Sequence, residues 1–213
     1  MALSAIILDF DGVLVESLDI KTKAFCEMYQ EYGDDIVAKV KGYHLTHGGV
    51  SRYDKFRYFS KELLGKELTG AELDILGIQF SKLVENAVVE APYVGGALEF
   101  LERYYTQFPL YVVSATPTDE LVRIVSRRNM QRYFRKIYGS PTTKGCLISN
   151  ILSENVYEKN MVVMVGDALA DYSGAMDAGV RFIGRVAKEN DNIFPPDVDV
   201  IRDLSGLKDI VFS

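Results

Sequence analysis

Hydrophobic residues follow two different patterns along the 213-residue chain. Near both ends, short continuous apolar runs alternate with longer stretches of helical periodicity. Such runs, bounded by turn residues, predict strands that are buried on both faces. Strands that alternate with helices predict a parallel sheet covered by helices on both sides. We therefore expect an α/β fold with a Rossmann-like, doubly wound parallel sheet, whose strands include Ala5–Leu8, Leu110–Ser114, Ile137–Gly139, Met161–Val165, Val180–Gly184 and an edge strand at Val198–Ile201.

The segment between Ile20 and Ala91 follows helical periodicity and shows no strand pattern. Thr69 and Glu72 form a capping-box signature, and Ser51 is expected to cap an earlier helix. Pro92 and the glycine pair after it mark the return to the sheet. We therefore expect a core domain of residues 1–17 and 92–213, with an all-helical domain inserted at 18–91. The helix after Thr69 is expected to bury Leu73, Leu76, Phe80, Leu83 and Ala87.

Composition narrows the possible partners. Hydrophobic residues make up 48% of the chain and charged residues 25%, which is ordinary for a soluble globular protein. The net charge of −6 argues against nucleic acid or an anionic membrane as a partner. Cys26 and Cys146 are too few for a disulfide framework. No signal peptide or membrane span is indicated, so a cytoplasmic location is expected. Monomer and homodimer both remain open.

Polar and charged residues that could take part in catalysis follow several of the apolar runs. Asp9 and Asp11 follow the first run, and alternation along a strand places them on the same side. Two close carboxylates repel each other, and a bound cation is the simplest remedy. A solvated Asp-x-Asp-Gly turn is the alternative. Later runs lead to Ser114, to Lys144, and to the pair Asp167 and Asp171.

These four stretches, in this order, resemble the motifs of the haloacid dehalogenase superfamily of phosphohydrolases. The first is Asp9-Phe-Asp-Gly-Val-Leu-Val-Glu-Ser17, and the last is Gly166-Asp-Ala-Leu-Ala-Asp171, followed by Ala178-Gly179. The helical insert is similar to the mobile cap of the branch that contains β-phosphoglucomutase and phosphoglycolate phosphatase. Ligands of open parallel sheets bind at the carboxyl ends of the strands, where all four motifs lie.

The resemblance implies a role for each motif residue. Asp9 is the expected nucleophile, which forms an aspartyl-phosphate, and Asp11 the expected general acid and base. Lys144 and Ser114, with Ala115 beside it, are expected to bind the phosphoryl group. Mg²⁺ is the expected cofactor, at a metal site formed by Asp9, the Asp11 backbone carbonyl, Asp167 and Asp171, with Asp171 holding Lys144 or a metal-bound water.

The expected activity is hydrolysis of a small phosphate monoester, such as a sugar phosphate. As the resemblance implies, members that cleave carbon–halogen or carbon–phosphorus bonds lack an acid at the position of Asp11. His47-Gly-Gly-Val-Ser-Arg52 resembles the Gly-Val-Ser-Arg loop of β-phosphoglucomutase, which makes Arg52 the candidate clamp for a second anion of the substrate. Lys21, a weaker substrate-binding candidate, stands where the mutase has a hinge histidine. A phosphatase is therefore favoured, and a phosphosugar mutase is the alternative.

Other interpretations of the charged residues stay open. A non-catalytic phosphoacceptor protein of the receiver-domain type would also combine aspartates, Ser or Thr, and Lys, although it would be shorter and lack the insert. His44 and His47 have no clustered partners for a metal site. The arginines at 123, 127 and 128 are expected on a solvated helix face.

Overall fold

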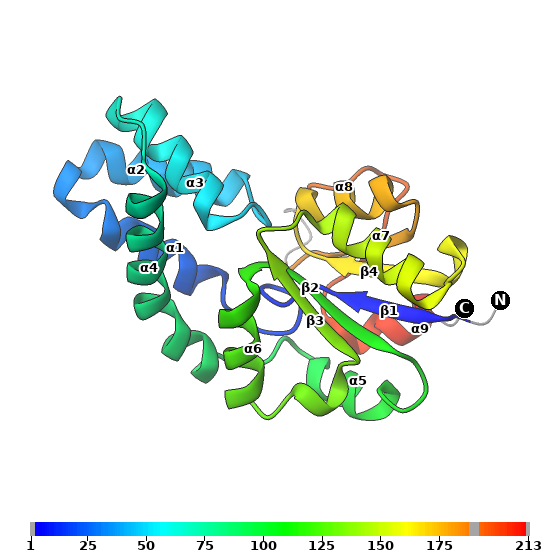
Figure 1. Ribbon diagram of the computed structural model, residues 1–213. Helices are drawn as coiled ribbons and strands as arrows, with labels where there is room; N and C mark the ends of the chain where they lie inside the picture. Colours follow the sequence, from blue (N-terminus) through cyan, green and yellow to red (C-terminus); the bar gives the residue numbers. More distant parts are fainter. Residues whose placement is uncertain (1–2, 188–191, 212–213) are drawn as a thin grey trace.

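The fold is built on one parallel sheet. The computed structural model describes residues 3–187 and 192–211, so residues 1, 2, 188–191, 212 and 213 of the expected core lie outside the described ranges. Within those ranges the sheet has six strands in the order β3-β2-β1-β4-β5-β6 (Figure 1). This result confirms the predicted fold class. The strands are β1 (Ala5–Leu8), β2 (Leu110–Pro117), β3 (Lys136–Ser140), β4 (Val162–Gly166), β5 (Arg181–Arg185) and β6 (Asp199–Ile201).

Helices cover both faces of the sheet, as the apolar runs predicted. Helices α5 (Ala97–Tyr104), α6 (Thr118–Arg127) and α9 (Leu207–Val211) lie on one face. Helices α7 (Lys144–Asn155) and α8 (Leu169–Ala178) lie on the other. Alternate residues of β1 therefore belong to different clusters, Ile6 and Leu8 to the first and Ala5 and Ile7 to the second.

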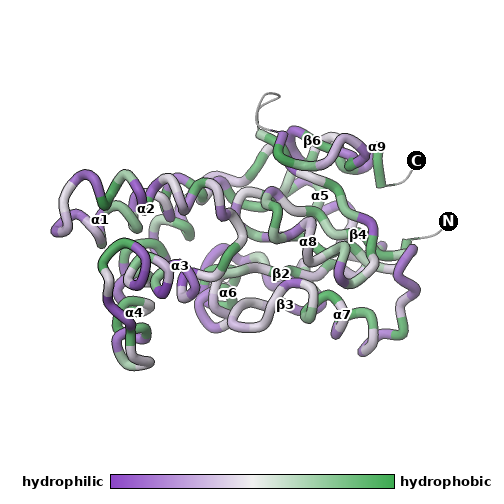
Figure 2. The backbone as a smooth tube through the Cα atoms, turned by 90° about the horizontal axis from the view of Figure 1, so that it is seen from above, coloured by the Kyte–Doolittle hydropathy of each residue, from purple (hydrophilic) through white to green (hydrophobic). Residues whose placement is uncertain are grey.

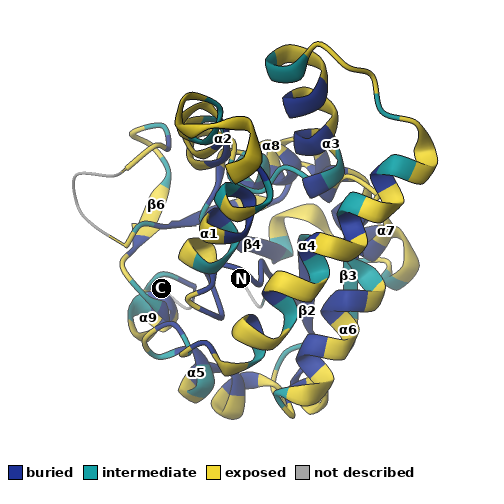
Figure 3. Cartoon of the chain, turned by 90° about the vertical axis from the view of Figure 1, so that its left-hand side faces the viewer, coloured by how far each residue is buried: buried dark blue, intermediate teal, exposed yellow. Residues whose placement is uncertain are grey.

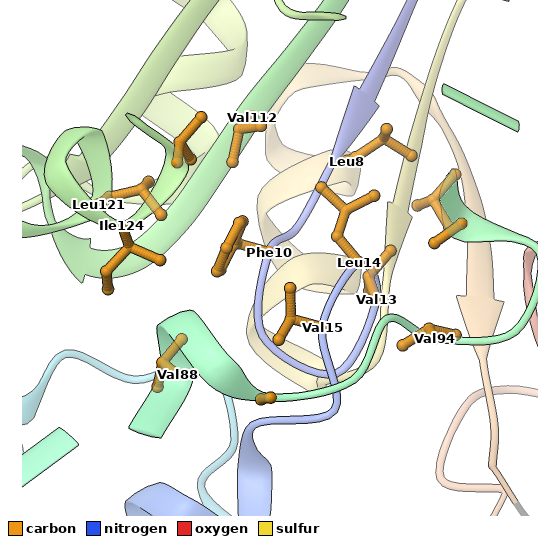
Figure 4. Close-up of a cluster of buried hydrophobic side chains, with 14 of the residues drawn as sticks. Leu8, Phe10, Val13, Leu14, Val15, Val88, Val94, Val112, Leu121 and Ile124 are labelled. Carbon is orange, nitrogen blue, oxygen red and sulfur yellow. The ribbon is translucent and has the colours of Figure 1, made fainter. Parts of the chain in front are cut away.

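The turn after β1 is anchored by its own apolar side chains. Phe10, Val13, Leu14 and Val15 are fully buried and continue the cluster that contains Leu8 (Figure 4). The amide of Asp9 also donates to the carbonyl of Val165 on the neighbouring strand β4, at 2.9 Å. The turn that carries the first two aspartates is therefore held in place before any ligand binds.

The inserted segment is helical and lies beside the sheet (Figure 1). Its core is aromatic: Phe25 packs against Phe56, Phe59 and Phe80, with ring centroids 4.4–5.7 Å apart. Its α-helices are α1 (Leu18–Met28), α2 (Asp34–Thr46), α3 (Arg52–Tyr58) and α4 (Gly70–Glu90). The short helical turns in the described residues include η1 (Gln30–Tyr32), the π-helix η2 (Phe59–Leu63), η3 (Gln131–Tyr133), η4 (Lys159–Met161) and η6 (Leu204–Gly206).

Helix α4 begins as predicted but buries a different stripe. Thr69 and Glu72 form the expected capping box, and Ser51 accepts the amide of Tyr53 at the start of α3. Buried and exposed positions alternate along α4 (Figure 3). Leu83 is 36% exposed, whereas the neighbouring Val84 is fully buried. Because residues 83–84 and 87–88 are all apolar, helical periodicity alone could not decide which of them faces inward. The buried residues are Leu73, Gly77, Phe80, Val84 and Val88.

The insert meets the core chiefly between α4 and α6. Arg123 and Arg127 form ion pairs with Glu85 of α4, at 2.8 and 3.4 Å. Arg128 donates to the carbonyl groups of Val88, Val89 and Ala91 at the end of α4. Arg123 and Arg127 are exposed, as expected for a solvated helix face, whereas Arg128 is half-buried. All three side chains also bridge two elements that sequence periodicity treats separately.

Hydrophilic and hydrophobic residues alternate along the helices, whereas the residues of the central strands are mostly hydrophobic (Figure 2). Among the described residues, no helix is long and apolar enough to cross a membrane.

Candidate active site

The charged residues of the four predicted motifs converge at the carboxyl ends of the central strands. Strand β1 lies between β2 and β4, with Leu8 opposite both Val112 and Val165, so the residues that follow these three strands become neighbours. Gly12 has φ +75°, and a Cβ at this position would lie only 2.3 Å from Asp167 Oδ2. Glycine is therefore required sterically where the first motif passes the fourth.

Asp9 is a buried carboxylate with one oxygen available. Its Oδ2 lies 3.1 Å from Lys144 Nζ, and its Oδ1 has no hydrogen-bond partner among the described residues. Burial and the nearby negative charge of Asp171 raise the pKa of Asp9 to about 7, although Lys144 opposes this shift. A group that binds Oδ1 and favours the ionised form would relieve this cost.

Lys144 is the central cation of the site. It begins α7, directly after the N-cap Thr143, and contacts both Asp9 and the fully buried Asp171. Burial alone would lower the pKa of Lys144, but the charges of Asp171 and Asp9 outweigh burial and raise it. Asp171 is itself fixed by the amide of Ala168, which donates to its Oδ2 at 3.1 Å. Lys144 therefore stays charged and pointed at Asp9.

Three carboxylates gather where a divalent cation could bind. One oxygen from each of Asp9, Asp167 and Asp171 lies within 4.8 Å of the other two. Burial and the charges of Asp9 and Asp171 raise the pKa of Asp167 well above its ordinary value. An all-oxygen donor set from three clustered carboxylates fits the preferences of Mg²⁺, so the residues present fit this ion.

Asp11 faces a different set of groups. Ser17 Oγ donates to its Oδ1 at 2.6 Å, and Thr116 Oγ1 donates to its Oδ2 at 3.0 Å. Lys21 Nζ forms an ion pair with Oδ2, and the Ser114 hydroxyl lies 3.5 Å from the same oxygen. Burial alone would raise the pKa of Asp11, but Lys21 and these hydroxyl groups outweigh burial and lower it.

Two of these contacts were missed by sequence reasoning. Thr116 lies two residues after Ser114 on β2, so alternation along the strand could have placed both hydroxyl groups at Asp11. Ser17 closes the first motif, but nothing in its spacing showed that the turn bends back onto Asp11. Lys21, expected to bind substrate, instead donates to Asp11 and, at 2.8 Å, to Thr116 Oγ1.

The remaining predicted residues lie further from Asp9. Ala115 is half-buried between Ser114 and Thr116. Arg52 pairs with Glu120 of α6, at 2.6 and 2.7 Å, so the structure does not bring it to the carboxylates. Gly49, in the same loop, does approach Lys144: a Cβ there would lie 2.9 Å from Ala170 Cβ and 3.6 Å from Lys144 Nζ. His44 contacts Lys55, and His47 stacks on Tyr43.

The family model described as haloacid dehalogenase-like hydrolase matches residues 6–185, which span all four motifs and the insert. The chain belongs to the haloacid dehalogenase-like hydrolase family. A comparison with curated proteins found no match.

Solved structures show that this hydrolase shares its whole fold with other proteins. The HAD-hydrolase candidate YfnB from Bacillus subtilis, solved with magnesium, is 17% identical with a TM-score of 0.74, and all of both chains is covered. A predicted phosphoglycolate phosphatase from Haemophilus somnus is 20% identical, with a TM-score of 0.74 and 98% and 97% coverage of the two chains. A candidate beta-phosphoglucomutase from Thermotoga maritima is 17% identical, with a TM-score of 0.72 and 99% coverage of each chain.

Proposed function

We propose that this hydrolase is a Mg²⁺-dependent phosphatase that cleaves a small phosphate monoester through an aspartyl-phosphate on Asp9. The observation that carries the proposal is the Asp9 carboxylate. One of its oxygens is fixed against Lys144, and the other has no hydrogen-bond partner among the described residues. A nucleophile needs such an oxygen, positioned but unengaged.

The surrounding residues fit the two steps of such a reaction. In the first step, Asp9 attacks the phosphorus atom, the bond to the ester oxygen breaks, and Asp11 gives a proton to the departing alkoxide. In the second step, Asp11 takes a proton from water, which attacks the aspartyl-phosphate and releases inorganic phosphate. Lys144 and the Ser114 hydroxyl would bind the oxygens of the phosphoryl group.

Mg²⁺ would be held by Asp9, Asp167 and the backbone carbonyl of Asp11, with Asp171 fixing Lys144 beside them. When bound, it would neutralise negative charge on the transferring group. The insert at 18–91 would act as the cap over this site. The approach of Gly49 to Lys144 supports that role, because the loop between α2 and α3 then excludes water from the carboxylates.

Hydrolysis of p-nitrophenyl phosphate tests the proposal. We expect release of inorganic phosphate with Mg²⁺ and none after chelation, with activity restored when Mg²⁺ returns. A protein that binds Mg²⁺ but turns over neither this ester nor a panel of sugar phosphates would overturn it. Transfer of phosphate between sugar positions without net release would instead favour the mutase alternative.

A further inference from the structure

Helix α3 carries two buried cations on the same face, Arg52 and, one turn later, Lys55. They are 5% and 2% exposed. Arg52 is neutralised by the core: its two terminal nitrogens lie 2.7 and 2.6 Å from the carboxylate oxygens of Glu120. It also donates to Ser81 Oγ at 2.9 Å and lies over the ring of Phe80. An anionic substrate would have to displace Glu120 in order to use Arg52.

Lys55 has no comparable counter-charge. Its Nζ lies 2.8 Å from His44 Nδ1 and 5.7 Å from the ring centroid of Phe25. Burial and the charge of Lys55 lower the pKa of His44 to about 3, so His44 is a neutral partner. Within residues 3–187 and 192–211, no carboxylate forms an ion pair with Lys55. Burial and the charge of Lys21 lower the pKa of Lys55 to about 7, as expected for an unbalanced buried amine.

Lys55 lies near Lys21, whose charge helps to lower the pKa of Lys55. Phe25, which contacts Lys55, stands one turn after Lys21 on α1. Lys21 in turn reaches Asp11 and Thr116. Helix α3 also begins directly after the loop in which Gly49 approaches Lys144. Lys55 is therefore connected to the site through α1, which carries Lys21, and through the loop that precedes α3.

We propose that Lys55 binds a second anionic group of the substrate, so that the natural substrate is a phosphate monoester that also carries a carboxylate or a second phosphate. This inference rests on the proposed phosphatase function. A buried ammonium group without a counter-ion is strongly unfavourable, and a bound anion would supply the missing charge where a neutral hydroxyl could not. Specificity for the second anion would then lie three residues beyond Arg52.

Matched substrate pairs test this assignment. The first pair is 2-phosphoglycolate and 2-hydroxyethyl phosphate, which differ in a carboxylate. The second pair is fructose 1,6-bisphosphate and fructose 1-phosphate, which differ in a phosphate. We expect wild-type kcat/KM to favour the anionic member of one pair by about 10- to 100-fold, and the pair that responds identifies the anion. Lys55→Met should bring that ratio close to one, with little change for the neutral member.

Control variants separate this role from a structural one. Lys61→Met removes an exposed lysine of the insert and should leave the ratio unchanged. The paired variant Arg52→Met/Glu120→Met, which leaves no buried charge unpaired, should change both members of a pair alike. Should Lys55→Met fail to fold, Lys55→Gln, which keeps a donor for His44, takes its place.

The outcomes separate this inference from the function on which it rests. Wild-type protein that hydrolyses p-nitrophenyl phosphate but prefers neither anionic substrate would overturn the role of Lys55 and leave the phosphatase standing. A preference that survives in the Lys55 variant, or one that only the Arg52 pair removes, would also overturn it. Failure to hydrolyse any phosphate ester would contradict both the proposed phosphatase function and the role of Lys55.

Discussion

Asp9 and Asp11 stand two residues apart, yet their surroundings shift their pKa values in opposite directions. Burial and Asp171 raise the pKa of Asp9, whereas Lys21 and the hydroxyl groups lower that of Asp11. Asp11 is therefore ionised in this arrangement, the form that accepts a proton from water. Protonating a leaving alkoxide would require the contact between Lys21 and Asp11 to loosen. The pKa values of the two aspartates therefore differ because their neighbouring groups differ.

The role of Asp11 predicts a dependence on the leaving group. Asp11→Asn should slow alkyl phosphates by about 10²- to 10⁴-fold, the usual contribution of general acid–base catalysis. p-Nitrophenyl phosphate, whose leaving group needs little protonation, should be affected much less in its first step. Single-turnover rates on both esters provide the measurement, with Asp177→Asn, an exposed acid of α8, as the control. Equal losses for both esters would show that Asp11 is not the general acid.

At the scale of elements, the local sequence pattern predicted the strands and motifs but not the contacts between distant elements. The apolar runs indicated the strands, and the motifs at their ends indicated Asp9, Asp11, Ser114 and Lys144 because parallel strands bring their carboxyl ends together. The partner of Arg52 could not be predicted in this way, since Glu120 lies 68 residues further along the chain in another element. Nor could the buried stripe of α4, where neighbouring apolar residues left the helical phase undecided.

The ion pair between Arg52 and Glu120 joins the insert to the core, and both side chains are almost completely buried. Arg52→Met should lower the free energy of unfolding by about 3–5 kcal/mol, because Glu120 would remain as an unpaired buried charge. Arg52→Met/Glu120→Met should recover most of that loss. Urea unfolding gives these values, with the exposed Arg57→Met as control, expected within about 0.5 kcal/mol of wild type. Additive losses in the double variant would mean that the pair is not coupled.

At the scale of the whole molecule, stability should respond to Mg²⁺ and pH together. Asp9 and Asp167 have raised pKa values, so both bind protons as pH falls toward 5.5, and Mg²⁺ must then displace those protons. At pH 8, above the pKa of about 7 of Asp9, this carboxylate is ionised and gains most from a cation. Mg²⁺ at about 100 times its dissociation constant contributes about 2.7 kcal/mol, and each kcal/mol raises Tm by about 2–4 °C for a chain of this size.

Thermal unfolding at pH 8 and pH 5.5, with Mg²⁺ and with chelator, measures this coupling. We expect the rise in Tm caused by Mg²⁺ to be clearly larger at pH 8. Asp167→Asn should lose most of that rise, and Asp177→Asn should keep it. The same rise at both pH values, or an undiminished rise in Asp167→Asn, would contradict the assignment of the metal ligands.

The Asp9→Asn variant tests the covalent mechanism most directly. The amide is nearly the same size as the carboxylate but cannot form an aspartyl-phosphate, so turnover of p-nitrophenyl phosphate and of the best natural substrate should both disappear. The fold should persist, because the change removes a charge from a crowded acidic cluster. Phosphate release by Asp9→Asn, prepared and assayed beside wild type and Asp177→Asn, is the deciding measurement. No detectable release by a folded Asp9→Asn protein is the predicted result, and substantial release would contradict nucleophilic catalysis by Asp9.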